Sequence, residues 1–89
     1  MADVSAPVEV TVRFFAAARA AAGAESDVLN VRPGATVADV VSELRCRSDE
    51  LARVLPRCSY LCDGIAVRDQ ATELRSGQTL DVLPPFAGG

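Results

Sequence analysis

The residues of this sequence best suited to chemistry are its last six, Pro84-Pro85-Phe86-Ala87-Gly88-Gly89. Proline fixes φ at about −65°, so we expect the pair to hold the chain extended and pointing away from the preceding strand. Two glycines without side chains fit a narrow channel, and six extended residues reach at most about 20 Å. The carboxylate at the end of such an arm is an acyl group that a partner enzyme can activate as an adenylate or a thioester. The alternative interpretation is a frayed chain end without a function.

Residue types missing from the sequence limit what the chain can catalyse alone. It contains no His and no Lys, which excludes Ser–His and Cys–His nucleophile pairs and Schiff-base chemistry. It also lacks a Gly-rich phosphate loop, so a partner enzyme must bind the ATP that activation requires. We therefore interpret the arm as a substrate or carrier rather than an active site, and we expect no stably bound cofactor.

The three cysteines, Cys46, Cys58 and Cys62, do not describe a disulfide framework or a zinc site. A zinc site needs about four ligands at paired spacings, and the sequence has no His to complete one. We expect all three to be reduced, small and mostly buried side chains. The alternative is a redox pair of Cys58 with Cys62, but on one strand these residues would lie about 13 Å apart, too far for a bond.

Length and composition describe one small domain with its own core. The chain has 89 residues, of which 49% are hydrophobic, and no apolar run approaches the roughly 20 residues that span a bilayer. Residues 1–7 do not have the pattern of a signal peptide, so we expect a cytoplasmic location. Nine arginines are scattered among twelve acidic residues, and the net charge of −3 argues against nucleic acid or a membrane as a partner.

Local patterns predict the strands of a sheet. They occur at residues 8–15, 26–31, 59–62, 65–68 and 79–83. Asp63-Gly64, between the third and fourth of these segments, is typical of a tight β-hairpin. The proline pair ends the last strand, because neither residue can donate a hydrogen bond to a neighbouring strand. Turns are expected at Pro33-Gly34 and at residues 74–77.

Helix signals separate the strands. Residues 16–22 are rich in Ala and precede Gly23, which predicts a short helical turn. The clearest helix begins at Thr36, which can cap the first turn, with Asp39 placed to suit the helix dipole. Its apolar stripe consists of Val37, Val40, Val41 and Leu44. A second helical stretch at residues 48–55 should stop before Pro56.

The order of these elements predicts an α+β fold, a sheet with one main helix packed on one face. We divide the chain into a flexible N-terminus at residues 1–7, a domain at residues 8–83 and an extended tail at residues 84–89.

Three parts of the sequence resemble the MoaD/ThiS group of ubiquitin-like sulfur carriers, and most of all the small subunits of molybdopterin synthase. The parts are the run from Val12 to Arg19, which contains Phe-Phe-Ala-x-x-Arg, the Asp63-Gly64 hairpin, and the Leu83-to-Gly89 ending with its Pro-Pro-x-x-Gly-Gly pattern. The resemblance extends from about Val8 to Gly89. Gln78 after Gly77 departs from the Gly-Asp that the family more often has, at a turn outside the chemistry.

This resemblance implies a β-grasp fold, with a mixed sheet whose first and last strands are neighbours, and a cycle of reactions at Gly89. A separate adenylating enzyme, related to ubiquitin activators, would join AMP from ATP to the Gly89 carboxylate. A sulfur donor protein would convert the adenylate to a thiocarboxylate. The loaded tail would then enter the large subunit of molybdopterin synthase and give its sulfur to cyclic pyranopterin monophosphate. Any Lys or His that this chemistry needs would come from the partner.

The same resemblance assigns roles to individual residues. Gly89 would carry the transferred group and Gly88 would give it access to the partner's pocket. The remaining candidates would bind partners, and they are Pro84, Pro85, Phe86, Leu83, Phe15 and Arg19. Phe86 could instead fold back on its own domain, and Arg19 could instead bond to backbone carbonyls at the helix surface. Phe15 and Leu83 fall on the outward side of adjacent strands, where they would form an apolar patch at the root of the tail.

Three alternatives remain open at the level of the sequence. The chain could carry sulfur for thiamine or cysteine synthesis, it could be a protein modifier joined through Gly89 to a lysine of its target, or it could be an interaction module with an incidental tail.

Overall fold

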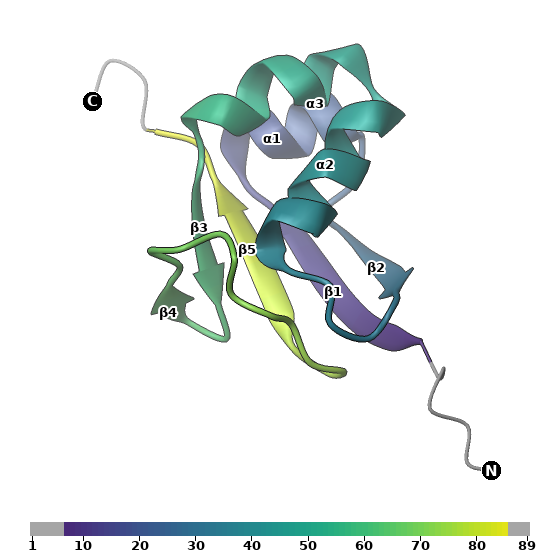
Figure 1. Cartoon of the computed structure of the whole chain (residues 1–89). Coiled ribbons are helices and arrows are strands. Elements are labelled where there is room, and N and C mark those ends of the chain that lie inside the picture. The colour runs from purple at the N-terminus through teal and green to yellow at the C-terminus, as the bar shows by residue number, and fades with distance from the viewer. Residues whose placement is uncertain (1–6, 86–89) are drawn as a thin grey trace, which may run out of the picture.

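Figure 1 shows the computed structural model of the protein, which describes residues 7–85. Its elements follow in the order β1 (Val8–Phe14), α1 (Ala16–Ala22), β2 (Ser26–Val31), α2 (Val37–Arg47), α3 (Asp49–Val54), the 3-10 helix η1 (Leu55–Arg57), β3 (Ser59–Cys62), β4 (Ile65–Ala66) and β5 (Thr79–Leu83). The predicted α+β fold class is confirmed. Within the described range no helix is long and apolar enough to cross a membrane.

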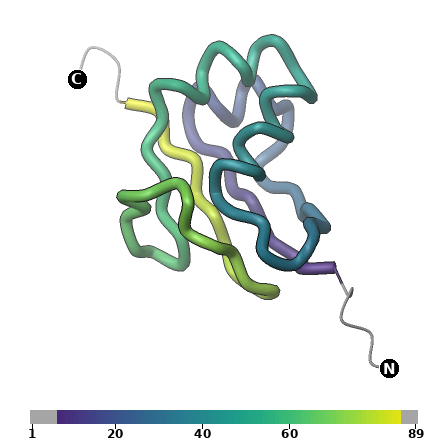
Figure 2. The backbone as a smooth tube through the Cα atoms, viewed as in Figure 1, coloured from purple at the N-terminus to yellow at the C-terminus, as the bar shows by residue number. Residues whose placement is uncertain are grey.

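The five strands form one mixed sheet in the order β2-β1-β5-β3-β4. Strand β1 pairs antiparallel with β2 and parallel with β5, so the first and last strands are neighbours, as a β-grasp fold requires. Strand β3 pairs antiparallel with the other side of β5, and β4 completes the sheet as its edge. Because β1 and β5 run parallel, the start of β1 and the end of β5 lie at opposite ends of the molecule, which Figure 2 shows clearly.

The main helix, α2, lies across one face of the sheet, as predicted, and the two short helical stretches expected at residues 16–22 and 48–55 form α1 and α3. Helices α1 and α3 pack against each other near the end of the sheet where β1 and β5 finish (Figure 1). The second α-helix of these two, α3, ends at Val54, before Pro56 as we expected, but the chain continues from it as the 3-10 helix η1. Pro56 lies inside η1, because proline is tolerated in the first turn of a helix, where its missing N–H has no partner to lose.

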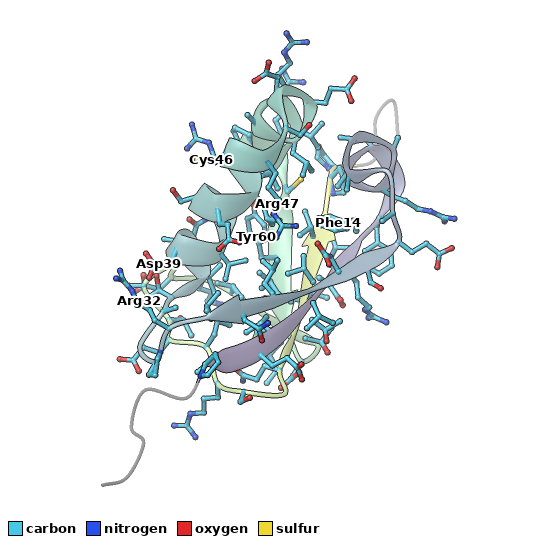
Figure 3. The ribbon with its side chains drawn as sticks, turned by 90° about the vertical axis from the view of Figure 1, so that its right-hand side faces the viewer. Phe14, Arg32, Asp39, Cys46, Arg47 and Tyr60 are labelled. Carbon is cyan, nitrogen blue, oxygen red and sulfur yellow. The ribbon has the colours of Figure 1, made fainter. Side chains whose placement is uncertain are left out.

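The core lies between the sheet and the helices. Alternate residues of β1 (Val10, Val12 and Phe14) and of β5 (Leu80 and Val82) are buried. They pack in one cluster with the apolar stripe of α2, whose buried members are Val37, Val40 and Leu44, while Val41 is half-buried. Phe14 and Tyr60 point into this space in Figure 3. The alternation that predicted the strands therefore has its physical origin in one shared core.

The hairpin at Asp63-Gly64 is confirmed, and its backbone explains the residues. Asp63 (φ 50°) and Gly64 (φ 83°) both adopt the left-handed conformation that a two-residue hairpin turn matching the sheet's twist requires. Strand β4, however, has only two residues instead of the four predicted. The chain leaves the sheet early because Asp69 begins a turn, in which its carbonyl accepts hydrogen bonds from both the N–H and the hydroxyl of Thr72.

Candidate functional site

The last described residues form the root of the tail. Strand β5 ends at Leu83, as the proline pair predicted, and the next residue, Pro84, is buried against the domain. Pro85 is exposed and is therefore the first residue of the tail to stand clear of the domain. The predictions for Phe86, Gly88 and Gly89 lie outside the described residues. The roles of the two prolines in partner binding stay predictions.

The sheet holds this root from both sides. On one side Val82 is aligned with Phe14, and the N–H of Phe15 donates a hydrogen bond to the Val82 carbonyl at 3.2 Å. On the other side Leu83 is aligned with Ser59 of β3. The tail therefore starts from a central strand with fixed direction, which limits the volume that the residues after Pro85 can reach.

Phe15 and Leu83 share the face of the sheet that the helices leave open. Phe15 continues β1 in an extended conformation and is 37% exposed, whereas Leu83 is half-buried. The predicted outward direction of both residues is confirmed by their register, in which their preceding neighbours Phe14 and Val82 are aligned and buried. Their role in contacting a partner stays a prediction.

An ion pair on the same face was missed by the sequence analysis. Asp81 is only 6% exposed, and both of its oxygens accept hydrogen bonds from Arg13, at 2.6 Å from Nε and 2.8 Å from Nη2. The hydrogen bond and the charge of Asp81 raise the pKa of Arg13 above its usual value. The Arg13 guanidinium also lies 5.5 Å from the centre of the Phe15 ring. It thus links the buried carboxylate to the exposed ring.

The alternation of residues along the two strands predicts that Arg13 and Asp81 both point outward from the core. This pattern is the signal in the sequence that could have identified the pair. Each alternates with buried apolar neighbours, and their strands are adjacent in any β-grasp sheet. What the sequence does not give is the register, which aligns Arg13 with Asp81 across 68 residues of chain.

Arg19 projects from α1 at the end of the molecule where the tail leaves. Its Nη2 lies 2.8 Å from an Oε2 oxygen of Glu25, and both side chains are exposed. Arg19, Arg13 and Phe15 line one recess of about 230 Å³, so the structure brings two of the predicted partner-binding residues together. The structure places Arg19 in an ion pair with Glu25 rather than on the backbone carbonyls of the alternative interpretation, and its contact with a partner stays a prediction.

The cysteines are free thiols, but they are less buried than we expected. Cys46 is exposed on the outer side of α2 (Figure 3), because it lies off the apolar stripe of that helix. Cys58 and Cys62 are half-buried beside the core, and burial raises the pKa of both thiols. A raised thiol pKa keeps both groups protonated near neutral pH and hence weakly nucleophilic. Within residues 7–85, no group of three His, Cys, Asp or Glu side chains is placed to hold a metal ion.

Two known proteins are similar in sequence to most of this chain. The Small archaeal modifier protein 3 of Haloferax volcanii is 35% identical in an alignment that covers 92% of this chain and all of that protein. The Molybdopterin synthase sulfur carrier subunit of Chlamydomonas reinhardtii is 26% identical, again over 92% of this chain and all of the relative.

A solved structure and a family model point the same way. The solution structure of the Haloferax volcanii HVO 2177 protein matches with a TM-score of 0.84 at 33% sequence identity, and the match covers all of this chain and 93% of that one. The sequence model of the ThiS family matches residues 12–89, which include the end of β1, the other four strands, the root of the tail and the terminal glycines. This chain therefore belongs to the ThiS family, the ThiS/MoaD group of ubiquitin-like β-grasp domains.

Proposed function

We propose that this protein is a sulfur carrier whose Gly89 is adenylated, converted to a thiocarboxylate, and used to deliver sulfur to cyclic pyranopterin monophosphate in molybdopterin synthesis. Family membership supports a ubiquitin-like carrier or modifier. The relative named as the sulfur carrier subunit of molybdopterin synthase supports this particular acceptor. The observation that carries the proposal is the family match that extends through Gly89, beyond the exposed Pro85 that follows a central strand.

In each step of the proposed cycle, one bond forms and another breaks. A carboxylate oxygen of Gly89 attacks the α-phosphorus of ATP on the activating enzyme, and pyrophosphate leaves. A sulfide equivalent from the sulfur donor protein then attacks the acyl carbon, and AMP leaves. On the large synthase subunit the sulfur of the thiocarboxylate attacks a carbon of the pterin side chain, and the C–O bond at that carbon breaks so that its oxygen leaves. Water then cleaves the acyl–sulfur bond, which leaves the sulfur on the pterin and restores the Gly89 carboxylate.

The geometry of the root suits this work. A carrier must present one group to two or more enzymes in the same way, and the pairing of β5 on both edges fixes where the tail begins. The four residues after Pro85 span at most about 14 Å when extended. The reacting carboxyl can therefore enter a pocket of the partner while the domain itself stays outside. All of these reactions are expected in the cytoplasm.

Mass spectrometry tests the proposal directly. The protein is incubated with ATP, the adenylating enzyme and a sulfur source, and the last tryptic peptide, residues 76–89, is weighed. The expected gain equals the mass difference between sulfur and oxygen. Deletion of Gly89 should abolish both this gain and molybdopterin formation without lowering the melting temperature, whereas deletion of Ala2 should leave all three unchanged. An unmodified peptide after full incubation would contradict the proposal.

A second candidate function is protein modification, which the similarity to Small archaeal modifier protein 3 favours. In that case Gly89 would form an isopeptide bond with a target lysine. The chain itself contains no Lys, so its copies cannot link to one another through lysine side chains. Conjugates would appear as a ladder of larger species, one for each target, instead of the exchange of oxygen for sulfur. Within the class of sulfur carriers, the partner that copurifies would separate molybdopterin synthesis from thiamine or cysteine synthesis.

A further inference from the structure

A shallow groove runs between helices α1 and α3 and ends at the root of the tail. It consists of two adjoining hollows of about 310 and 360 Å³, both lined by Ala17, Arg53 and Val54. In Figure 1 the two helices lie side by side near the end of β5 from which the tail leaves. The groove and the root of the tail, Pro84 and Pro85, thus form one continuous surface.

The floor of the groove is apolar and the end nearest the tail is basic. Ala17 and Ala20 of α1 are exposed, Ala21 and Val54 are half-buried, and these small side chains allow another chain to approach closely. Arg57 joins Pro84 and Pro85 at the end beside the tail. The acidic residue in the lining is Glu50, and it lies in the hollow away from the prolines.

Arg53 and Arg57 form no ion pair with an acidic side chain of the described domain. Among the described residues, the ion pairs engage Arg13, Arg19 and Arg47, and neither Arg53 nor Arg57 takes part in one. Both side chains are exposed. The protein as a whole carries a net charge of −3, so these two guanidinium groups form a local basic site on an acidic molecule. A negatively charged membrane or nucleic acid would face the acidic rest of the surface, whereas a short segment with one carboxylate can contact the two arginines alone.

We propose that the groove is a docking site for the adenylating enzyme, and that it takes an apolar segment of that enzyme bearing a carboxylate that pairs with Arg53 and Arg57. This inference rests on the proposed function, because it assumes that an enzyme takes up the tail. Two features carry it: the groove is continuous with the root of the tail, and its free charges are complementary to an acidic side chain. Such pairs guide the approach of a partner and fix its orientation. Docking at the groove would place the start of the tail at the entrance of the enzyme's active site before any chemistry takes place.

The test is steady-state adenylation, measured as ATP–pyrophosphate exchange with the purified adenylating enzyme of the same organism. The Arg53→Glu/Arg57→Glu variant is expected to raise the KM for the carrier about tenfold or more with little change in kcat, because like charges would then face each other. The Arg53→Gln/Arg57→Gln variant, which keeps much of each side chain, should raise KM less and should weaken the dependence of KM on salt. The matched control is Arg68→Glu/Arg75→Glu, which changes the net charge equally at exposed positions outside the groove.

Each outcome separates this inference from the proposed function. A wild-type protein that is never adenylated contradicts both. Normal adenylation with equal KM values for the groove variant and its control contradicts the groove alone, as does a KM that falls in the Gln variant, which would indicate that the protein's own tail carboxylate occupies the arginines. Melting temperatures of all variants establish that a raised KM does not come from unfolding.

Discussion

Tyr60 shows how one buried polar group couples the core to pH. Its side chain is 5% exposed, and its hydroxyl donates a hydrogen bond to the Leu55 carbonyl at 3.0 Å. Burial, and then the charge of Cys58, raise the pKa of Tyr60 from its ordinary value of 10.0 to about 12. Since the unfolded chain loses this proton more readily, the group's contribution to stability is present below pH 10 and is lost as the pH rises from about 10 to 12.

We predict that Tyr60→Phe lowers the free energy of unfolding by about 1 kcal/mol at neutral pH, because the Leu55 carbonyl loses its donor. The same variant should lose stability less steeply above pH 10. Urea unfolding followed across this pH range gives both quantities. The raised thiol pKa values of Cys58 and Cys62 act in the same direction, so the informative quantity is the difference between the variant and the wild type. Parallel curves for the two proteins would contradict the assignment.

At the level of elements, local signals predicted the start of α2 and the hairpin turn, but not the register between strands that are distant in sequence. The start of α2 could be predicted because its capping partners lie three residues apart: Thr36 Oγ1 accepts from the Asp39 N–H at 3.2 Å, and the Asp39 carboxylate accepts from the Thr36 N–H at 2.9 Å. The hairpin could be predicted for the same reason, because its turn depends on the neighbouring residues Asp63 and Gly64. The pairing of Arg13 with Asp81 depends on how β1 and β5 align, which the shared core decides and no short stretch of sequence records.

Removing the cap of α2 tests how much this local motif contributes. Thr36→Ala is expected to lower the free energy of unfolding by about 1 kcal/mol, because an N–H of the first helical turn loses its acceptor. The hydrogen bond from the Thr36 backbone is the main cause that lowers the pKa of Asp39 below 3.8, so the part of the stability that Asp39 contributes is present above that pH and fades as the pH falls below it. The control is Ser42→Ala, an exposed substitution in the same helix, and an equal loss in both variants would contradict the role of the cap.

For the whole molecule, the C-terminal arm could be predicted from residue types, but the surface around its root could not. The Pro-Pro-x-x-Gly-Gly ending identified the tail from residue types alone, and the exposed Pro85 agrees with an arm that starts at the domain surface. The groove between α1 and α3 could not be predicted, since Ala17 and Arg53 come together only through the packing of two short helices. The groove therefore depends on how the helices pack, whereas the tail that would carry the transferred group can be identified from the sequence alone.

If domain and tail act together, the distance between the docked surface and the reacting carboxyl must matter. Inserting two glycines between Pro85 and Phe86 would lengthen the arm by up to about 7 Å without touching the groove or the sheet. We predict an unchanged KM for adenylation and a kcat lower by about tenfold or more, because the carboxyl is no longer held at the position of reaction. The same insertion between Pro7 and Val8, at the opposite end of the molecule, should change neither constant. A normal kcat with the lengthened arm would mean that the enzyme captures the chain end by itself, and that the fixed root of β5 does not position it.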